Sequence, residues 1–592
     1  MAVAGDVLAV VAGVSGKDRA EVGWHPVGGE VTDTSIRDQL AAVPVADVLE
    51  GRVVGEGHDA GPGASEIEGV ENGAAFLAEA VANDGSWRRR RWSHDRGARR
   101  HDQGRQHAGQ VGAVVASARA AMIHFGTSGW RGIVGQDFTF RNVRTAVEAV
   151  VAVLRQRSVT GEVLVSYDTR LLSEKFAREA VAVLTHHGVS AVLSERDLPT
   201  PCLAYAVRER GSAMGIMFTA SHNPPEYNGV KLYTREGTLA PRELTDAIEL
   251  EAARLLGSAD IFYVPQKNLA QTAPLTEGYL ASLERDIDWD AIRSRALKVA
   301  VDPLFGTARE FLDRLLIAHG VPTSVVHSTK DPYFGGYAPE CTPQNLAGLR
   351  ELVRTSGADL GLATDGDADR FGVVDRACRA LSPNLVLALL VEYLVGARGV
   401  RGAVGRTVGT TRLVDRVARA AGCDVVVTPV GFHHFGPLLT TRRIEIATEE
   451  SAGLGVAAHL SERDGIYAAL LVVELLAVSG LPLTEHIRRL FARHGTLVSR
   501  RVQLPWRDRT RSGMEKLLRR RFREFAGLAV SREDRSDGLL LELEDGGWVL
   551  IRPAGTEPKL RIYAEGVSSR QLRVLVQEAR RLIREAEEEQ DV

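Results

Sequence analysis

Cysteine is scarce in this sequence. The 592-residue chain has four cysteines, and none stands close enough to another to form the paired ligands of a zinc site. They are Cys202, Cys341, Cys378 and Cys423. Because structural disulfides belong mainly to oxidising compartments, this usage favours a reducing cytoplasm as the location.

A membrane-spanning run and a secretion signal are also missing. The best apolar runs, Leu385–Val391 and Ala468–Val473, end at Glu392 and Glu474, far short of the ~20 residues that span a bilayer. Met1–Ala20 carries an aspartate and no basic leader, unlike a secretory signal. We therefore expect no membrane partner.

Strong charge of one sign is absent as well. The net charge is −3, and 44% hydrophobic with 25% charged residues is ordinary for a soluble globular protein. This balance gives no general attraction to nucleic acid, which is therefore not an expected partner. At roughly 150 residues per domain, the length predicts about four domains.

Residues 1–121 differ in composition from the rest. They are rich in Ala, Val, Gly, Asp and Arg, and eight arginines fall between Arg88 and Arg105. A basic nucleic-acid-binding arm is one interpretation. A disordered extension, or sequence read from a start codon set too early, is the other. We expect the second, because Met122 directly precedes the first strong motif.

From Met122 onward, strand, polar loop and helix alternate. Three such units begin with the apolar runs Val163–Val165, Leu297–Val301 and Ala403–Val404. Such alternation predicts α/β domains with mainly parallel sheets. We place these domains at residues 122–265, 266–380 and 381–495.

The end of the chain has a different pattern of predicted strands and helices. Val502–Leu504, Leu539–Leu543 and Trp548–Ile551 are typical of strands, and Arg570–Glu588 is typical of a helix. We expect a smaller α+β domain at residues 496–592. The predicted fold class is therefore three similar α/β domains in series, with mainly parallel sheets, followed by this C-terminal α+β domain.

A serine stands where an apolar strand meets a polar turn. The run Gly215–Phe218 is followed by Thr219-Ala220-Ser221-His222-Asn223-Pro224-Pro225. Two prolines and the pair Asn228-Gly229 predict a tight, exposed loop in which no strand continues. With a histidine beside it and Lys231 ten positions on, Ser221 is placed like a reactive hydroxyl. The alternative is an ordinary turn rich in Ser and Asn.

Three carboxylates alternate in the segment Asp365-Gly366-Asp367-Ala368-Asp369-Arg370, between two apolar runs. They would repel one another unless a cation collects them, and hard oxygen ligands suit Mg²⁺. A calcium EF-hand begins in the same way but requires Gly and Glu where this chain has Arg370 and Arg376. We expect a magnesium site at Asp365, Asp367 and Asp369, with a solvated acidic turn as the alternative.

Together these loops resemble motifs of the α-D-phosphohexomutase family, the phosphoglucomutases and phosphomannomutases. The resemblance extends from about Phe125 to Glu565 and rests on five motifs in the family's order. They are the opening motif Gly126-Thr127-Ser128-Gly129-Trp130-Arg131-Gly132, the phosphoserine loop Thr219–Pro224, the metal loop Asp365–Arg370, the sugar-recognition loop Glu449-Glu450-Ser451 and the phosphate-binding loop Arg552-Pro553-Ala554-Gly555-Thr556-Glu557-Pro558.

The resemblance implies a reversible phosphoryl transfer between the 1- and 6-positions of a hexose phosphate, in a central cleft where four domains meet. Ser221 would carry a phosphoryl group, give it to the hexose monophosphate, and take the other group back from the hexose 1,6-bisphosphate. Mg²⁺ on the three aspartates would also contact Ser221 and offset charge on the transferring group. Glucose 1,6-bisphosphate is the expected primer, and a monomer or homodimer the expected state.

The resemblance also implies roles for further residues, from the positions they occupy in the motifs. Lys231 matches the candidate general acid/base, assisted by His222, Arg131 and Arg370. Glu449 and Ser451 would hydrogen-bond to sugar hydroxyls, unless Ser451 is instead a helix N-cap. The other expected substrate-binding residues are Thr410, His433, Arg552, Gly555 and Thr556.

Two positions depart from the family's pattern. Ala554 stands where a serine is common, which removes a phosphate hydrogen bond of about 1.5–3 kcal/mol. His433 stands where glucose-handling relatives often carry lysine, so its charge would depend on pH. Both changes bear on affinity or substrate preference and leave the chemistry in place.

Glucose 1-phosphate to glucose 6-phosphate is the expected reaction. The Glu449–Ser451 loop, Thr410-Thr411 and Arg463–Ile466 resemble phosphoglucomutase more than phosphoglucosamine mutase. Mannose phosphates, or both sugars, are the alternative, since glucose and mannose differ only at the C2 hydroxyl. A metal-dependent phosphatase and a non-catalytic sugar-phosphate binder are the rivals from other classes.

Overall fold

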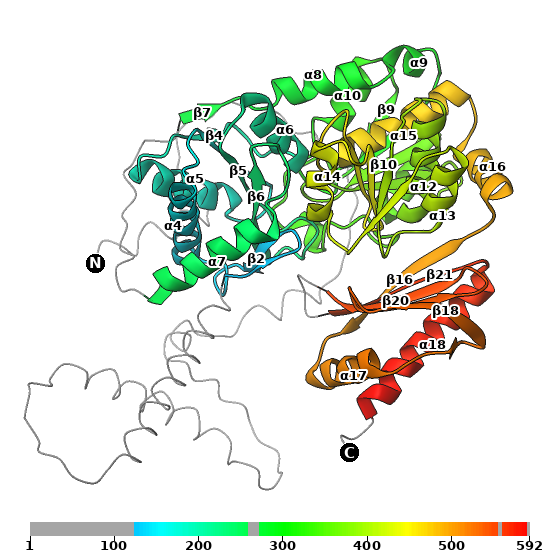
Figure 1. Ribbon diagram of the computed structural model, residues 1–592. Coiled ribbons are helices and arrows are strands. Elements are labelled where there is room, and N and C mark those ends of the chain that lie inside the picture. The colour runs from blue at the N-terminus through cyan, green and yellow to red at the C-terminus, as the bar shows by residue number, and fades with distance from the viewer. Residues whose placement is uncertain (1–122, 258–270, 555–558, 589–592) are drawn as a thin grey trace, which may run out of the picture. The chain divides into compact units, whose positions relative to one another are not determined.

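The computed structural model describes residues 123–257, 271–554 and 559–588 (Figure 1). The expectation for residues 1–121 therefore lies outside the described residues. Within those residues the strands form four sheets, of which three are mixed and the last is antiparallel. This confirms the predicted fold class of α/β domains followed by a C-terminal α+β domain.

The first sheet is built around two parallel neighbours, β3 (Val163–Tyr167) and β5 (Met214–Phe218). Both are short, mostly apolar and buried throughout, as expected for parallel strands covered by helices. Across the sheet the order is β1-β2-β6-β5-β3-β4-β7, and β6 pairs antiparallel with β5 and β2. The remaining elements are β1 (Phe125–Gly126), β2 (Gly129–Ile133), α4 (Phe140–Gln156), α5 (Ser173–His186), β4 (Ala191–Ser194), α6 (Thr200–Arg210), β6 (Tyr227–Thr234), α7 (Arg242–Gly257) and β7 (Gln271–Ala273).

The second sheet places the acidic segment in a hairpin. Its order is β11-β10-β8-β9, with β8 (Val299–Asp302) parallel to β10 (Leu360–Thr364), and β10 antiparallel to β11 (Phe371–Asp375). The carboxylates follow the carboxyl end of β10, where ligands commonly bind in α/β sheets. The other elements are α8 (Glu277–Asp286), α9 (Trp289–Arg293), α10 (Leu312–Ala318), β9 (Thr323–Val325), η1 (Phe334–Gly336) and α11 (Ala347–Ser356).

The third sheet repeats this plan in the order β13-β12-β14-β15. The hairpin of β14 (Ile446–Glu449) and β15 (Gly453–Val456) presents the predicted sugar-recognition loop. The other elements are α12 (Pro383–Gly396), β12 (Val404–Thr407), α13 (Leu413–Ala420), β13 (Val425–Thr428), η2 (Phe432–His434), α14 (Gly436–Thr440), α15 (Gly465–Ser479) and α16 (Leu483–His494).

The fourth sheet is antiparallel, in the order β16-β21-β20-β19-β18-β17. Helix α18 packs on it through Leu575, Ala579 and Ile583, beside α17. The elements are β16 (Val498–Pro505), α17 (Asp508–Arg519), β17 (Glu524–Phe525), β18 (Leu528–Asp534), β19 (Leu539–Leu543), β20 (Trp548–Pro553), β21 (Lys559–Gly566) and α18 (Ser569–Glu588).

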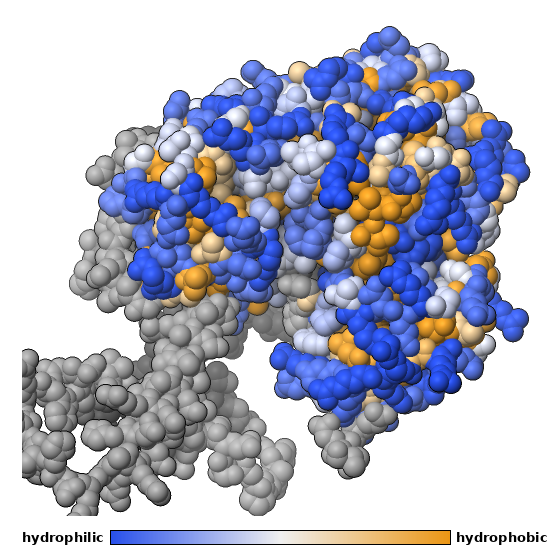
Figure 2. All heavy atoms as spheres, in the orientation of Figure 1, coloured by the Kyte–Doolittle hydropathy of each residue, from blue (hydrophilic) through white to orange (hydrophobic). Residues whose placement is uncertain are grey.

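The longest apolar stretches are used in the core. Helices α12 and α15 are hydrophobic almost all round and contribute to the largest buried cluster, while hydrophilic residues cover most of the face in Figure 2. Among the described helices, none alone is long and apolar enough to cross a membrane, although the bent pair α15 and α16 meets that length and composition together.

Candidate active site

Ser221 lies in the turn between β5 and β6, in a conformation that few residues other than glycine adopt. Its φ is +52°, which costs energy unless the surroundings hold it. The Arg170 side chain donates from Nη2 to the main-chain oxygens of Ser221 and Asn223, at 2.6 Å each, and from Nη1 to two further carbonyls of this turn. Arg170 therefore fixes the backbone that presents the Ser221 hydroxyl.

A turn does follow β5 as predicted, but the predictions that it is exposed at Ser221 and that it includes Asn228-Gly229 are wrong. Ser221 and Asn223 are fully buried, and Asn228-Gly229 lies inside β6. Gly229 pairs with Arg131 of β2, and a Cβ at this glycine would lie 2.5 Å from the Trp130 carbonyl oxygen. The glycine is therefore required by the close approach of two strands rather than by a turn.

Asp365, Asp367 and Asp369 form a compact buried cluster. Each is at most 1% exposed, and one oxygen from each lies within 4.8 Å of the others. Ala368 has a φ of +60°, which curls the loop so that the carboxylates converge. A solvated acidic turn is excluded by this burial.

The serine and the acidic cluster are in contact. Ser221 Oγ donates to Asp365 Oδ2 at 3.0 Å, although the two residues are 144 positions apart. The loops approach so closely that a Cβ on Gly366 would lie 2.9 Å from the Ser221 carbonyl oxygen. Glycine is therefore needed where the acidic loop passes the serine.

Buried cations surround the cluster. Lys231 Nζ lies 2.5 Å from Asp367 Oδ2 and 2.6 Å from Asp369 Oδ2, and Arg463 Nη2 lies 2.9 Å from the same Asp369 oxygen. Burial and the neighbouring carboxylates raise the pKa of Asp365 well above its usual value. Burial opposes ionisation of Asp369 too, but Arg463 and Lys231 lower its pKa. Asp369, in contact with both cations, therefore stays ionised.

The cluster fits a hard divalent cation. Asp367 Oδ1 and Asp369 Oδ1 are buried and have no hydrogen-bond partner among the described residues. Buried acceptors of this kind are costly unless something pairs with them. Carboxylate oxygens that converge on one point are the ligands that Mg²⁺ prefers.

Three further predicted catalytic residues meet at this point. Arg131 Nη1 donates to the Asn223 side chain at 2.7 Å, and Arg370 Nη1 donates to His222 Nδ1 at 2.8 Å. Burial and Arg370 hold the pKa of His222 well below its ordinary value; burial and Arg370 also lower the pKa of Arg131 to about 10. His222 is therefore neutral, and its Nδ1 accepts the hydrogen bond from Arg370. Ser221 Oγ lies 3.4 Å from the same nitrogen.

The predicted sugar-recognition residues are held by Arg463. Ser451 Oγ donates to Glu449 Oε2 at 2.7 Å, and Arg463 Nη1 donates to the same oxygen at 3.0 Å. Ser451 lies in the β14–β15 hairpin, so the helix N-cap alternative is wrong. Thr410 is fully buried, and its hydroxyl is bonded to the Thr448 carbonyl at 3.2 Å and to the Thr407 hydroxyl.

A cavity of about 580 Å³ opens beside these residues. Residues of the second, third and fourth domains line this cavity. The charged residues in the lining are Glu340, Arg370, Glu450, Arg500 and Arg501. The sequence alone assigns no site role to Arg170 or Arg501, and it places Glu450 and Arg463 only as members of motifs, without a role of their own. Arg170 had a usable signal, because it follows β3 at the sheet edge where Ser221 follows the neighbouring strand β5.

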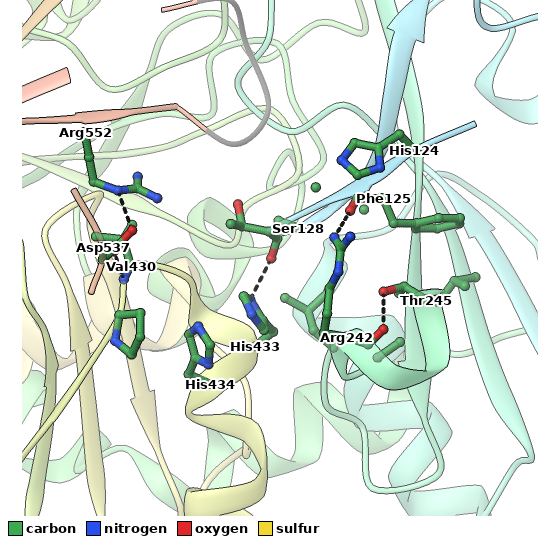
Figure 3. Close-up of a pocket in the computed structure, with 17 residues that line it drawn as sticks. His124, Phe125, Ser128, Arg242, Thr245, Val430, His433, His434, Asp537 and Arg552 are labelled. Atoms are coloured by element: carbon green, nitrogen blue, oxygen red, sulfur yellow. Dashed lines mark hydrogen bonds and ion pairs between the residues drawn. The ribbon is translucent and has the colours of Figure 1, made fainter. Parts of the chain in front are cut away.

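A second cavity, of about 290 Å³, holds His433 and Arg552 (Figure 3). His433 Nδ1 is 3.0 Å from the Thr127 carbonyl oxygen and must donate to it. Burial and the adjacent His434 lower the pKa of His433 to about 4, so its ring is neutral near pH 7. The predicted phosphate-binding residues Gly555 and Thr556 lie outside the described residues.

Comparison with known proteins finds matches over most of the described region. The phosphoglucomutase/phosphomannomutase models for α/β/α domains I, II and III match residues 122–256, 277–378 and 382–494, and the model for the C-terminal domain matches residues 517–582. The domain boundaries proposed from the sequence stay predictions.

Individual relatives carry different substrate names. A probable phosphoglucosamine mutase of Methanothermobacter thermautotrophicus is 31% identical over 77% of this chain and 96% of its own length. A phosphoglucomutase/phosphomannomutase of Thermococcus kodakarensis is 29% identical over 78% and 98%. The crystal structure of a candidate phosphomannomutase from Thermus thermophilus matches with a TM-score of 0.69 and 32% identity, covering 78% of this chain and 99% of that one.

The fold and the site define a multidomain α/β protein in which a buried serine contacts a buried loop of three aspartates. The domain matches and the 31% identical relative identify the group more closely. The chain belongs to the phosphoglucomutase/phosphomannomutase family.

Proposed function

We propose that this chain is a phosphohexomutase that moves a phosphoryl group between the 1- and 6-oxygens of a hexose phosphate, with glucose phosphates as its substrates. The contact of Ser221 Oγ with Asp365 Oδ2 at 3.0 Å carries the proposal. Phosphoryl transfer depends mainly on positioning and charge neutralisation. A hydroxyl held against a cation-binding cluster meets both needs.

In this proposal Ser221 carries the phosphoryl group in the working enzyme and donates it to the free hydroxyl of the substrate. Its position is supported by the Arg170 bonds to the turn. Arg131 and Arg370 bring positive charge to the same place, and neutral His222 orients Arg370 by accepting its hydrogen bond.

Asp365, Asp367 and Asp369 would hold Mg²⁺, which when bound supplies positive charge against the transferring group. Lys231 Nζ is a buried ammonium that contacts two of these carboxylates. We assign to Lys231 the proton exchange at the substrate hydroxyl that accompanies each transfer.

The sugar ring would occupy the 580 Å³ cavity that Ser451 lines, with Glu449 behind it. Arg370, Arg500 and Arg501 in this lining outnumber Glu340 and Glu450. An excess of positive charge disfavours the cationic 2-ammonium group of glucosamine. It tolerates the neutral C2 hydroxyl of glucose or mannose, which supports a neutral sugar despite relatives named for glucosamine.

The test is a parallel assay with Mg²⁺ and glucose 1,6-bisphosphate as primer. Glucose 1-phosphate, mannose 1-phosphate and glucosamine 1-phosphate are supplied separately, and 6-phosphate products and inorganic phosphate are both measured. We expect the highest kcat/KM with glucose 1-phosphate and no net release of phosphate. Phosphate release without isomerisation indicates a phosphatase, and absence of turnover with every sugar overturns the proposal.

Ser221→Ala is expected to lower kcat by at least about a thousandfold, because the acceptor oxygen is lost. Ser212→Ala is the matched control. Ser212 is also buried, just before β5, but its hydroxyl has no hydrogen-bond partner among the described residues. Turnover by Ser221→Ala at the level of Ser212→Ala would contradict the assigned role.

A further inference from the structure

Asp537 lies in the turn between β18 and β19 and contacts a predicted phosphate-binding residue. Its Oδ1 accepts a hydrogen bond from Arg552 Nε at 3.0 Å (Figure 3). Both side chains are largely buried, at 16% and 8% exposure, so solvent screens this ion pair less than a surface pair.

The other oxygen of the same carboxylate reaches a different domain. Asp537 Oδ2 accepts from the Val430 main-chain N–H at 2.7 Å. Val430 begins the segment that continues to His433 and His434, and all three line the 290 Å³ cavity with Arg552. One carboxylate therefore joins Arg552 of the C-terminal domain to the segment of the third domain that carries His433 and His434.

The turn that carries Asp537 is pressed against the strand that carries Arg552. Gly538 has a φ of +100°, and a Cβ there would lie 2.4 Å from the Ile551 carbonyl oxygen and 2.6 Å from Arg552 Cβ. Leu539 then pairs with Ile551 in the sheet. The backbone therefore sets the distance between Asp537 and Arg552.

The geometry of the pair leaves the arginine able to bind an anion. Asp537 accepts its hydrogen bond from Arg552 Nε. The other two nitrogens of this guanidinium, Nη1 and Nη2, have no hydrogen-bond partner among the described residues. These two terminal nitrogens can together donate to a phosphate in a forked contact. A carboxylate on Nε fixes the plane of the guanidinium while keeping that face open.

We propose that Asp537 is a positioning residue for substrate phosphate: it orients Arg552 and ties it to the Val430–His434 segment, so that Arg552 is held at this cavity to bind the phosphate that is not being transferred. This inference rests on the proposed function, in which Arg552 binds that phosphate.

Simple electrostatics predicts the opposite effect, which makes the inference testable. Removing a carboxylate near an anion site would, by charge alone, tighten phosphate binding. Loss of positioning weakens it. The direction in which the KM for glucose 1-phosphate changes in the Asp537→Asn variant therefore distinguishes a positioning effect from a simple charge effect.

We expect Asp537→Asn and Asp537→Ala to raise KM by about tenfold, the equivalent of one lost charge-assisted hydrogen bond. We expect kcat to change less than about threefold, because contacts to the non-transferring phosphate are made in ground and transition states alike. Asp537→Asn keeps an amide oxygen for Val430 and guards against misfolding; thermal unfolding verifies the fold of each variant.

Asp545→Asn is the matched control, since Asp545 occupies the next turn of the same sheet and bonds to Gln571 and Gly547. It should leave KM unchanged. If Asp537 acts through Arg552, the variant Asp537→Ala/Arg552→Ala has the same KM as Arg552→Ala alone. A lowered or unchanged KM for Asp537→Asn, or effects that multiply in the double variant, overturns the inference alone. An unaltered enzyme that isomerises no hexose phosphate overturns the proposed function as well.

Discussion

Arg170 lies beneath the Ser221 turn, and its side chain is completely buried. Asp168, 3.2 Å away, balances its charge, and Asp168 in turn accepts from Thr219 and Ser173. A buried charge of this kind is tolerated because nearly all of its donors are bonded. The network fixes Ser221 at positive φ, so the position of the hydroxyl that we propose as the phosphoryl carrier depends on a residue buried beneath the turn.

Arg170→Lys tests this dependence. Lysine keeps the charge but cannot reach several carbonyls in a fixed fork. Loss of two such bonds should destabilise the fold by about 2–4 kcal/mol and lower kcat by about tenfold or more. Chemical denaturation and steady-state kinetics measure the two effects. Arg178→Lys, on the exposed face of α5 in an ion pair with Glu174, should change stability by less than about 0.5 kcal/mol.

Helix α15 begins at the site, and a buried histidine supports its first turn. Asp464 caps the helix by accepting from the Tyr467 N–H at 2.9 Å. His459 lies between Asp464 and Asp286, at 3.0 and 2.8 Å, and stacks on Tyr467. Arg463, which holds Asp369 and Glu449, precedes this cap. The start of this helix therefore carries a buried charge network next to the ion pairs that Arg463 makes with Asp369 and Glu449.

This network predicts a pH dependence of stability. Burial opposes protonation, but hydrogen bonds to Asp286 and Asp464 raise the pKa of His459 above 6.5. A raised pKa contributes stability that is fully present below the unfolded value of about 6.5 and is lost as pH rises through the folded value. The difference in Tm between the unaltered protein and His459→Gln should therefore be largest near pH 6 and shrink toward pH 9. A gap that stays constant over this range would contradict the prediction.

At the scale of the whole molecule, the site exists because different domains meet. Ser221 and Lys231 come from the first sheet's domain, the aspartates from the second, and Arg463 from the third. Arg501 of the fourth pairs with Glu340 of the second. A cation bound to the acidic cluster would therefore stabilise contacts between domains as well as its own loop.

Mg²⁺ should accordingly raise the midpoint of thermal unfolding, and EDTA should reverse the rise. At a hundred times the dissociation constant the expected gain is ~2.7 kcal/mol. Asp367→Asn should abolish most of this response and lower turnover. Asp375→Asn is the control, because Asp375 is buried at the end of the adjoining strand but pairs with Arg379. An equal response of the two variants to Mg²⁺ would argue against the assigned cluster.

Strand and loop placement could be predicted from the sequence to a large extent. Apolar runs in the sequence predicted β3, β5, β10 and β19, because a short buried strand shows itself as a short run of apolar residues. The acidic segment was recognised because three carboxylates so close together need a cation. The prediction that Asn228-Gly229 forms a turn was wrong for a physical reason. The pair is typical of turns, but here the glycine makes room for a neighbouring strand.

By itself, then, the sequence determined the family, the order of α/β and α+β domains, and the loops that hold the serine and the aspartates. Only the tertiary structure decided that these loops are buried and which charges face them. Arg463 illustrates the reason, since it bonds to Ser128 across 335 positions and to Glu449 across 14. Residue type and spacing report what a segment can do locally, whereas partners so far apart meet only through the packing of whole domains.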